Sequence, residues 1–181
     1  VLLRSPYAAG KLVRCDLTKA RAMPGVRAAI AAPDVPRTLA GWSIRDTPLF
    51  ARERVRYVGE PIAAVAADSL AKAFAAAEAI MFEIDSETPV LDLEAACQPE
   101  APVLHPDWKD YIPAAGSDFP RKGNIAAECS ADPGGIDEIF ASAPYVIEDE
   151  FTSQRQYQAY LEPKSAIASY RDERYTVHTG H

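Results

Sequence analysis

Apolar residues in the first half of the chain follow two periods, which predict strands interleaved with helices. Alternating or short continuous apolar stretches predict strands at residues 11–16, 26–32, 54–58, 62–67 and 81–85. Recurrence at helical spacing predicts a helix over 69–79, with Asp68 as its N-cap. A shorter helix is expected at 18–23, ended by Pro24-Gly25. Residues 37–50 show no period and are expected to form a loop.

The inward positions of these segments predict the core of a mixed α/β domain. They are Val55, Tyr57, Ile62, Val65, Leu70, Phe74 and Phe82. Phe74 is the largest apolar side chain of the predicted helix, so we expect it to be buried.

The pattern dissolves after residue 87, where prolines recur up to residue 133. So long a stretch without period is uncommon inside one compact domain. We therefore interpret residues 97–133 as a linker with little regular structure and few contacts with the core. Its Trp108 and Tyr111 are expected to pack against another surface.

Periodic structure resumes after Gly134-Gly135. A short helix is predicted from Ile136 to about Ala143, followed by a strand over 145–151. Two further stretches, 166–170 and 175–177, flank a turn at 172–173 and predict a hairpin.

Composition narrows the classes of function. The chain of 181 residues is 48% hydrophobic, and its 19 basic against 26 acidic residues give a net charge of −7. This balance argues against a nucleic-acid surface, and no apolar run is long enough to span a membrane. Cys15, Cys97 and Cys129 lie far apart in sequence, which excludes a zinc ribbon or a CxxC motif and fits a reducing compartment.

Few residues suggest chemistry by themselves. No phosphate-binding loop, dinucleotide fingerprint, nucleophile elbow or HExxH motif is present. Arg52, Arg54 and Arg56 share a predicted strand face, which could meet an anionic cofactor, meet a partner's acidic patch or simply be solvated. The residues alone thus predict an α/β domain and the start of a second one, without a complete active site.

Residues 54–65, RVRYVGEPIAAV, resemble a signature of the molybdopterin-binding large subunit of the xanthine dehydrogenase, aldehyde oxidase and aerobic carbon monoxide dehydrogenase family. Other segments resemble the same family in the same order along the chain. They are residues 3–8, 23–26, 73–78, 92–96, 154–155 and 161–163. Two positions depart from the family pattern, which often has His where Ala9 and Gln158 stand here.

The resemblance implies an α/β fold of defined organisation. It implies an α/β-hammerhead domain at 1–96, the linker at 97–133 and the beginning of a molybdenum-cofactor-binding domain at 134–181. In the family, a Gln that approaches the molybdenum would follow residue 181, so Gln158, Glu162 and His181 are candidates for the edge of the molybdenum site. The family's glycine-rich cofactor loops and catalytic Glu are absent, and we expect a fragment that binds no cofactor alone and is inactive alone.

The same resemblance implies an oxidoreductase that hydroxylates an aldehyde or N-heterocycle, or oxidises carbon monoxide. Electrons would pass to iron–sulfur and FAD-binding partners in a cytoplasmic oligomer without nucleic acid or membrane. The alternative is a free-standing, non-catalytic hammerhead module for binding or assembly. A reading frame that continues past His181 would favour the enzyme, and a stop codon there would favour the module.

Overall fold

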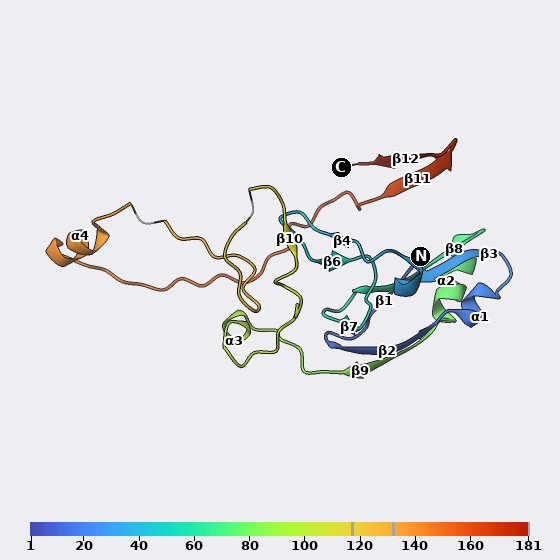
Figure 1. Cartoon of the computed structure of the whole chain (residues 1–181), viewed down its shortest axis with the longest axis horizontal. Coiled ribbons are helices and arrows are strands. Elements are labelled where there is room, and N and C mark those ends of the chain that lie inside the picture. The colour runs from blue at the N-terminus through green and yellow to red at the C-terminus, as the bar shows by residue number, and fades with distance from the viewer. Residues whose placement is uncertain (117, 132, 181) are drawn as a thin grey trace. The chain divides into compact units, whose positions relative to one another are not determined.

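The computed structural model describes residues 1–116, 118–131 and 133–180. The chain divides into two compact units, Val1–Ala131 and Asp132–His181, and each is described by itself. Figure 1 shows their elements in chain order.

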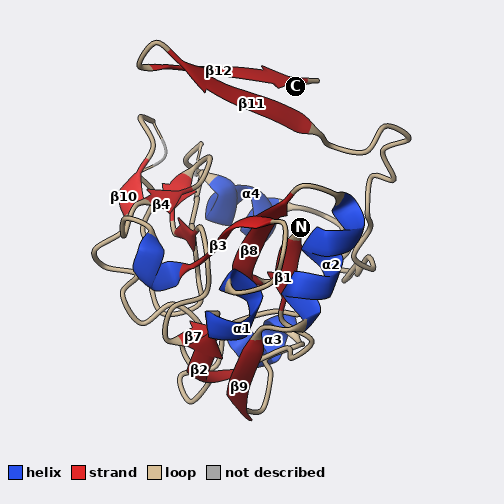
Figure 2. Ribbon diagram, turned by 90° about the vertical axis from the view of Figure 1, so that its right-hand side faces the viewer, coloured by secondary structure: helices blue, strands red, loops and turns tan. Residues whose placement is uncertain are grey.

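A three-stranded antiparallel sheet lies at the centre of the first unit. Its middle strand is β8 (Pro61–Ala67), flanked by β1 (Leu2–Arg4) and β3 (Val26–Ala31). Two helices, α1 (Thr18–Arg21) and α2 (Leu70–Glu78), pack against one face of this sheet (Figure 2).

A second three-stranded sheet covers the other face. Here β2 (Gly10–Asp16) lies between β7 (Arg54–Val55) and β9 (Met81–Ser86). Successive side chains of a strand point to opposite faces, so β8 contributes to two clusters. Ala63 and Val65 pack towards the helices, and Ile62 packs with Val55 between the sheets. β8 is therefore covered on both faces at Ile62 and Ala63, whereas Ala66, further along the face of Ile62, is exposed.

Shorter elements complete the first unit. The predicted loop at 37–50 is wrong in part, since it contains three two-residue strands, β4 (Leu39–Ala40), β5 (Ile44–Arg45) and β6 (Thr47–Pro48). β4 pairs with β6, and β5 pairs with β10 (Ile112–Pro113). The 3-10 turn η1 (Ala32–Asp34) and the helix α3 (Leu93–Ala96) are the remaining named elements.

The predicted linker carries little regular structure in its described residues. β10 is its one named strand, and none of the buried core residues comes from 97–133. The expectation of little regular structure is confirmed. Trp108 and Tyr111 line a cavity together with Ile44 and Asp46, so they pack against residues outside the linker, as expected.

The face of the helix was predicted wrongly. α2 buries Ala73, Ala76 and Ala77, whereas Phe74 is 52% exposed and Leu70 is 69% exposed. The small side chains allow α2 to pack closely on β8, where Phe or Leu would need a wider gap between helix and sheet. The N-cap is Ser69 rather than Asp68, because the Ser69 Oγ accepts a hydrogen bond from the Lys72 backbone N–H at 3.3 Å.

Other core predictions had mixed outcomes. Val55, Ile62 and Val65 are buried, as predicted, and Phe82 is partly buried against the second cluster. Tyr57 is 49% exposed because β7 ends at Val55 and the chain turns there.

The second unit contains α4 (Ile136–Ser142) and the antiparallel pair β11 (Ala166–Arg171) and β12 (Arg174–Thr179). The predicted hairpin is confirmed. Its two turn residues, Asp172 and Glu173, have φ of 51° and 60°, the left-handed pair that suits a two-residue turn. The predicted strand at 145–151 is wrong, since these residues pair with no strand among those described.

The packing of α2 gives a test of the helix face. Ala76→Leu should destabilise the chain by about 1–3 kcal/mol, because it overfills a fully buried position. Phe74→Ala should cost less than the ~3–5 kcal/mol typical of a buried Phe, since half of its side chain is in solvent. Urea unfolding of the 181-residue variants measures both. A larger loss for Phe74→Ala than for Ala76→Leu would contradict this packing.

Candidate functional site

A tight turn at residues 56–60 is built around the carboxylate of Glu60. This side chain is only 4% exposed and forms an ion pair with the Arg56 guanidinium at 3.0 Å. It also accepts a hydrogen bond from the Arg56 backbone N–H at 2.6 Å. Gly59 has φ of 93°, a conformation that favours glycine, and this lets the chain reverse before Pro61. The buried carboxylate therefore fixes the turn that starts β8.

The same turn binds the N-terminal segment. The Ser5 N–H donates to the Glu60 carbonyl at 2.9 Å, and the Gly59 N–H donates to the Ser5 carbonyl at 2.8 Å. The Arg4 guanidinium donates to the Gly59 carbonyl at 2.8 Å. Two segments that carried the family resemblance, 3–8 and 54–65, are thus hydrogen-bonded to each other. Their shared role in this chain is structural.

Arg56 also joins the turn to the linker. Its Nε donates to the Leu104 carbonyl at 3.3 Å, and the Leu104 N–H donates to the Asn124 side chain at 2.9 Å. The Asn124 amide donates in turn to the carbonyls of Ala96 and Pro102, each at 3.0 Å. The Asn124 amide and the Arg56 guanidinium thereby fix the path of the linker around Leu104, where the chain has no long helix or strand.

A small cavity of about 70 Å³ lies between the linker and the segment that carries β5, lined by residues from 44–46, 104–111 and 121–126. On its wall the His105 Nδ1 is 3.0 Å from the Tyr111 hydroxyl, and the two rings meet edge to face. Burial, reinforced by the nearby Arg56 charge, lowers the pKa of His105 below 6.5. Burial likewise raises the pKa of Tyr111 above 10. Both shifts favour the neutral form of the side chain.

The three predicted arginines line one hollow but are engaged by their own chain. Arg52 donates to the Val35 and Pro36 carbonyls, and Arg54 pairs with Glu87. The hollow, of about 320 Å³, also contains Asp46, Glu53, Asp107 and Asp110. Its walls therefore carry both signs of charge, which argues against a dedicated site for an anionic cofactor.

The candidate molybdenum-edge residues belong to the second unit. Glu162 lies beside the end of β12, since its Oε1 would be 3.4 Å from a Cβ placed on Gly180. Gln158 is exposed in a segment without regular structure. His181 lies outside the described residues. The structure thus brings Glu162 to the strand end and leaves Gln158 exposed on its own segment.

These residues do not by themselves fit a complete cofactor site. Among the residues that the structure describes, no group of three or more His, Cys, Asp or Glu side chains could hold a metal ion. The three cysteines are free, with Cys97 and Cys129 exposed. A pterin and its phosphate need several convergent donors, and Glu162 with Gln158 can supply only an edge of such a site.

Comparison with known proteins identifies the family. Residues 1–88 match the model of the aldehyde oxidase and xanthine dehydrogenase a/b hammerhead domain, and residues 119–181 match that of the molybdopterin cofactor-binding domain. The chain belongs to this family of molybdopterin-binding enzymes. The resemblance drawn from the ordered segments is confirmed, and so is the α/β-hammerhead fold class. Proteins of this family carry a molybdenum cofactor.

Individual relatives agree with this assignment. A probable xanthine dehydrogenase subunit of Bacillus subtilis (strain 168) is 34% identical over 99% of this chain. Among solved structures, a Cu,Mo-CO dehydrogenase matches 99% of the chain with a TM-score of 0.80 and 28% identity. Quinoline 2-oxidoreductase from Pseudomonas putida 86 matches 99% of it with a TM-score of 0.77 and 28% identity.

The chain spans about a fifth of these proteins, namely 22% of the Bacillus relative, 23% of the CO dehydrogenase chain and 22% of the quinoline enzyme. The relatives include proteins named as subunits or large chains, which places the family among multi-subunit enzymes. Within the described residues no helix is long and apolar enough to cross a membrane.

Sequence reasoning missed the Arg56–Glu60 pair and His105. The signal for the first was present, because Arg and Glu four residues apart precede a proline within the resembled segment. No local pattern marked His105, whose environment comes from residues far from it along the chain.

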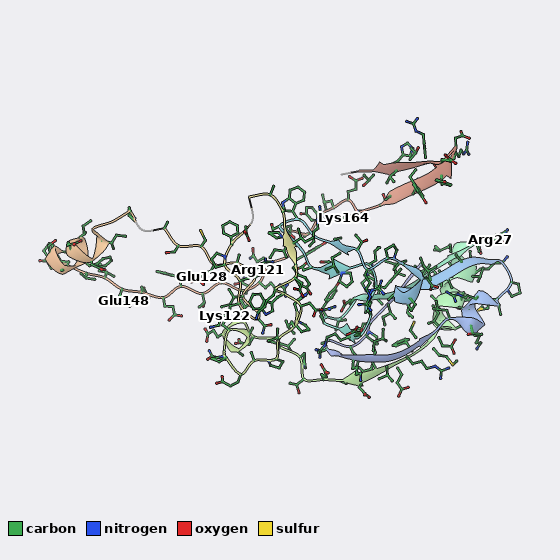
Figure 3. All side chains as sticks on the ribbon, in the orientation of Figure 1. Arg27, Arg121, Lys122, Glu128, Glu148 and Lys164 are labelled. Atoms are coloured by element: carbon green, nitrogen blue, oxygen red, sulfur yellow. The ribbon has the colours of Figure 1, made fainter. Side chains whose placement is uncertain are left out.

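The buried ion pair should make a large contribution to stability. Glu60→Leu leaves the Arg56 charge without its partner and should cost about 3 kcal/mol or more. The double variant Arg56→Met/Glu60→Leu should lose less than the sum of the two single variants, since no charge remains buried. Urea unfolding of the wild type, the two single variants and the double variant measures these losses. Arg27→Met, which opens an exposed pair with Asp68, is the control and should cost under ~1 kcal/mol (Figure 3). Equal losses at the two pairs would contradict a special role for Glu60.

The lowered pKa of His105 implies a defined dependence of stability on pH. His105 in the unfolded chain binds a proton near pH 6.5, whereas in the folded chain it does so only at lower pH. The free energy of unfolding is therefore unaffected by this group above pH 6.5 and falls as the pH drops below that value. Urea midpoints should therefore fall between pH 7.5 and 5.5 for the wild type and change less in His105→Gln. Carboxylates contribute only at lower pH, since their unfolded values lie near 3.8. If the urea midpoint of His105→Gln fell with pH as steeply as that of the wild type, His105 would not be the group responsible.

Proposed function

We propose that the chain is the N-terminal part of the large subunit of a molybdenum-dependent oxidoreductase. The parent enzyme would hydroxylate an aldehyde or N-heterocycle, or oxidise carbon monoxide. Within it we propose a hammerhead domain at 1–96, a linker at 97–133 and the beginning of the cofactor-binding domain at 134–181.

The observation that carries this proposal is the succession of two matches along one chain. A hammerhead match is followed by a molybdopterin cofactor-binding match, and the second continues to residue 181. Relatives that combine the same segments are named as xanthine, nicotinate and carbon monoxide dehydrogenases. All of these relatives are named as dehydrogenases, and the substrates in their names differ. The proposal therefore specifies the class of reaction and leaves the substrate to the assay.

The contribution of this chain to catalysis would be the edge of the molybdenum site. When bound, a molybdenum cofactor supplies two-electron oxidation of the substrate. Glu162, Gln158 and His181 would lie at the edge of that site, with Glu162 close to Gly180 at the end of β12. The donors that enclose the cofactor would come from other parts of the enzyme, so the 181-residue chain alone would bind no cofactor and would be inactive.

The partners would be the remainder of the molybdenum subunit together with iron–sulfur and FAD-binding subunits or domains. They would form a cytoplasmic oligomer and receive the electrons released at the molybdenum site. Relatives that are named as one subunit or as the large chain of a dehydrogenase support a multi-subunit assembly.

The decisive experiment compares the 181-residue chain with the full product of its gene, co-expressed with neighbouring genes. Molybdenum, pterin and the oxidation of an aldehyde, a purine and carbon monoxide are measured for both. We expect stoichiometric molybdenum and turnover of one substrate class for the full product, and neither for the chain. A reading frame that stops after His181 would favour a free-standing module, and stoichiometric metal in the chain would overturn the proposal.

A substitution in the full product tests this edge of the site. Glu162→Gln should lower molybdenum content or turnover by about tenfold, as loss of a residue that supports a metal site commonly does. Glu148→Gln, an exposed carboxylate in the same unit (Figure 3), is the matched control and should change neither. Identical behaviour of the two variants would remove Glu162 from the site.

A further inference from the structure

An apolar groove with an acidic rim lies on the first unit where β9 leads into α3. Its volume is about 520 Å³, and its walls come from residues 88–92 and 95–102. Apolar side chains supply most of the lining, among them Pro89, Val90, Leu91, Ala95 and Pro102. The hollow is thus formed mainly by the segments on either side of α3, with Ala95 as the contribution of the helix. Figure 1 labels α3.

Leu91, in the wall of this groove, is 82% exposed, far more than packing inside the unit would leave it. Leu93, in the first turn of α3, is 85% exposed but is not a wall of the groove. Neither belongs to the two core clusters. Exposed apolar side chains gathered at one hollow commonly mark an interaction surface.

The charges around the groove have one sign. Asp92 and Glu100 line it, and Glu94 follows on α3, while residues 88–102 contain no Lys or Arg. Asp92 uses one carboxylate oxygen to cap α3, accepting from the Ala95 N–H at 2.8 Å. Lys122 is not a wall of this groove but lines an adjoining hollow, which shares Gln98 and Ala101 with it. The rim is thus acidic, and its own segment holds no basic residue to neutralise it.

We propose that this groove docks a segment of a partner polypeptide that carries apolar side chains flanked by Lys or Arg. The apolar side chains would enter the hollow beside Leu91, and the basic groups would face Asp92 and Glu100, the two carboxylates that line it. Complementary charge would set the orientation and the rate of encounter, while burial of the apolar side chains would supply most of the affinity. The proposal does not depend on the catalytic role suggested above.

The test measures fluorescence anisotropy of three labelled peptides of equal length with the 181-residue chain. One has leucines flanked by lysines, one has glutamates in place of the lysines, and one has serines in place of the leucines. We expect the first to bind about tenfold or more tightly than either other peptide. The serine peptide measures the general attraction of lysines to a chain of net charge −7.

Variants of the 181-residue chain test whether the peptide binds at the groove. Leu91→Ser should weaken binding of the first peptide about tenfold, and Glu100→Gln should weaken it and reduce its dependence on salt. Leu161→Ser and Glu148→Gln, exposed residues of the second unit, are matched controls expected to bind like the wild type. These sites are exposed, so circular dichroism should show unchanged folding in every variant. Equal binding of all three peptides, no saturable binding, or equal losses in groove and control variants would overturn the proposal.

Discussion

Burial of β8 on both faces at Ile62 and Ala63 is the constraint on which the first unit depends. One face of this strand meets α1 and α2, and the other meets the sheet of β7, β2 and β9. Where the strand is enclosed in this way it needs apolar side chains at successive residues, and Ile62, Ala63 and Val65 provide the buried ones, while Ala66 is exposed. The small size of most side chains of β8 then sets how closely α2 can approach. The alanines of strand and helix are therefore one packing solution, and neither set would suffice without the other.

The turn before β8 connects this strand to the linker and to the N-terminal segment through hydrogen bonds. Glu60 is buried just before the strand and is neutralised by Arg56, whose guanidinium also reaches the Leu104 carbonyl. Through Ser5 the same turn holds the N-terminal strand. A segment that resembles a signature of an enzyme family thus acts here as a structural junction. Family resemblance marked these residues correctly, and the contacts within the chain show that they organise the hammerhead region.

The two units differ in how far they are self-sufficient. The first has two buried clusters, whereas no described residue of 133–180 is buried. An isolated two-stranded hairpin is marginally stable in water, and β11 and β12 expose Ile167, Tyr170, Tyr175 and Val177. The alternating segment at 145–151 likewise has strand-forming side chains but no partner strand among the described residues. Its sequence and its conformation are reconciled if the partner strand lies in another part of the larger enzyme that we propose.

The sequence by itself determined the position of most elements, the hairpin at 166–179 and the family, because periodicity and turn residues are local properties. It also indicated Glu162 and Gln158 through resemblance. Only the tertiary structure decided which face of α2 is buried, because that choice depends on the width left between helix and sheet, and alanines fit where Phe74 does not. It likewise decided that Arg56 pairs with Glu60, that His105 meets Tyr111 and that Glu162 lies beside Gly180. Contacts such as the last two join residues that no local pattern relates, so they follow from the path of the folded chain.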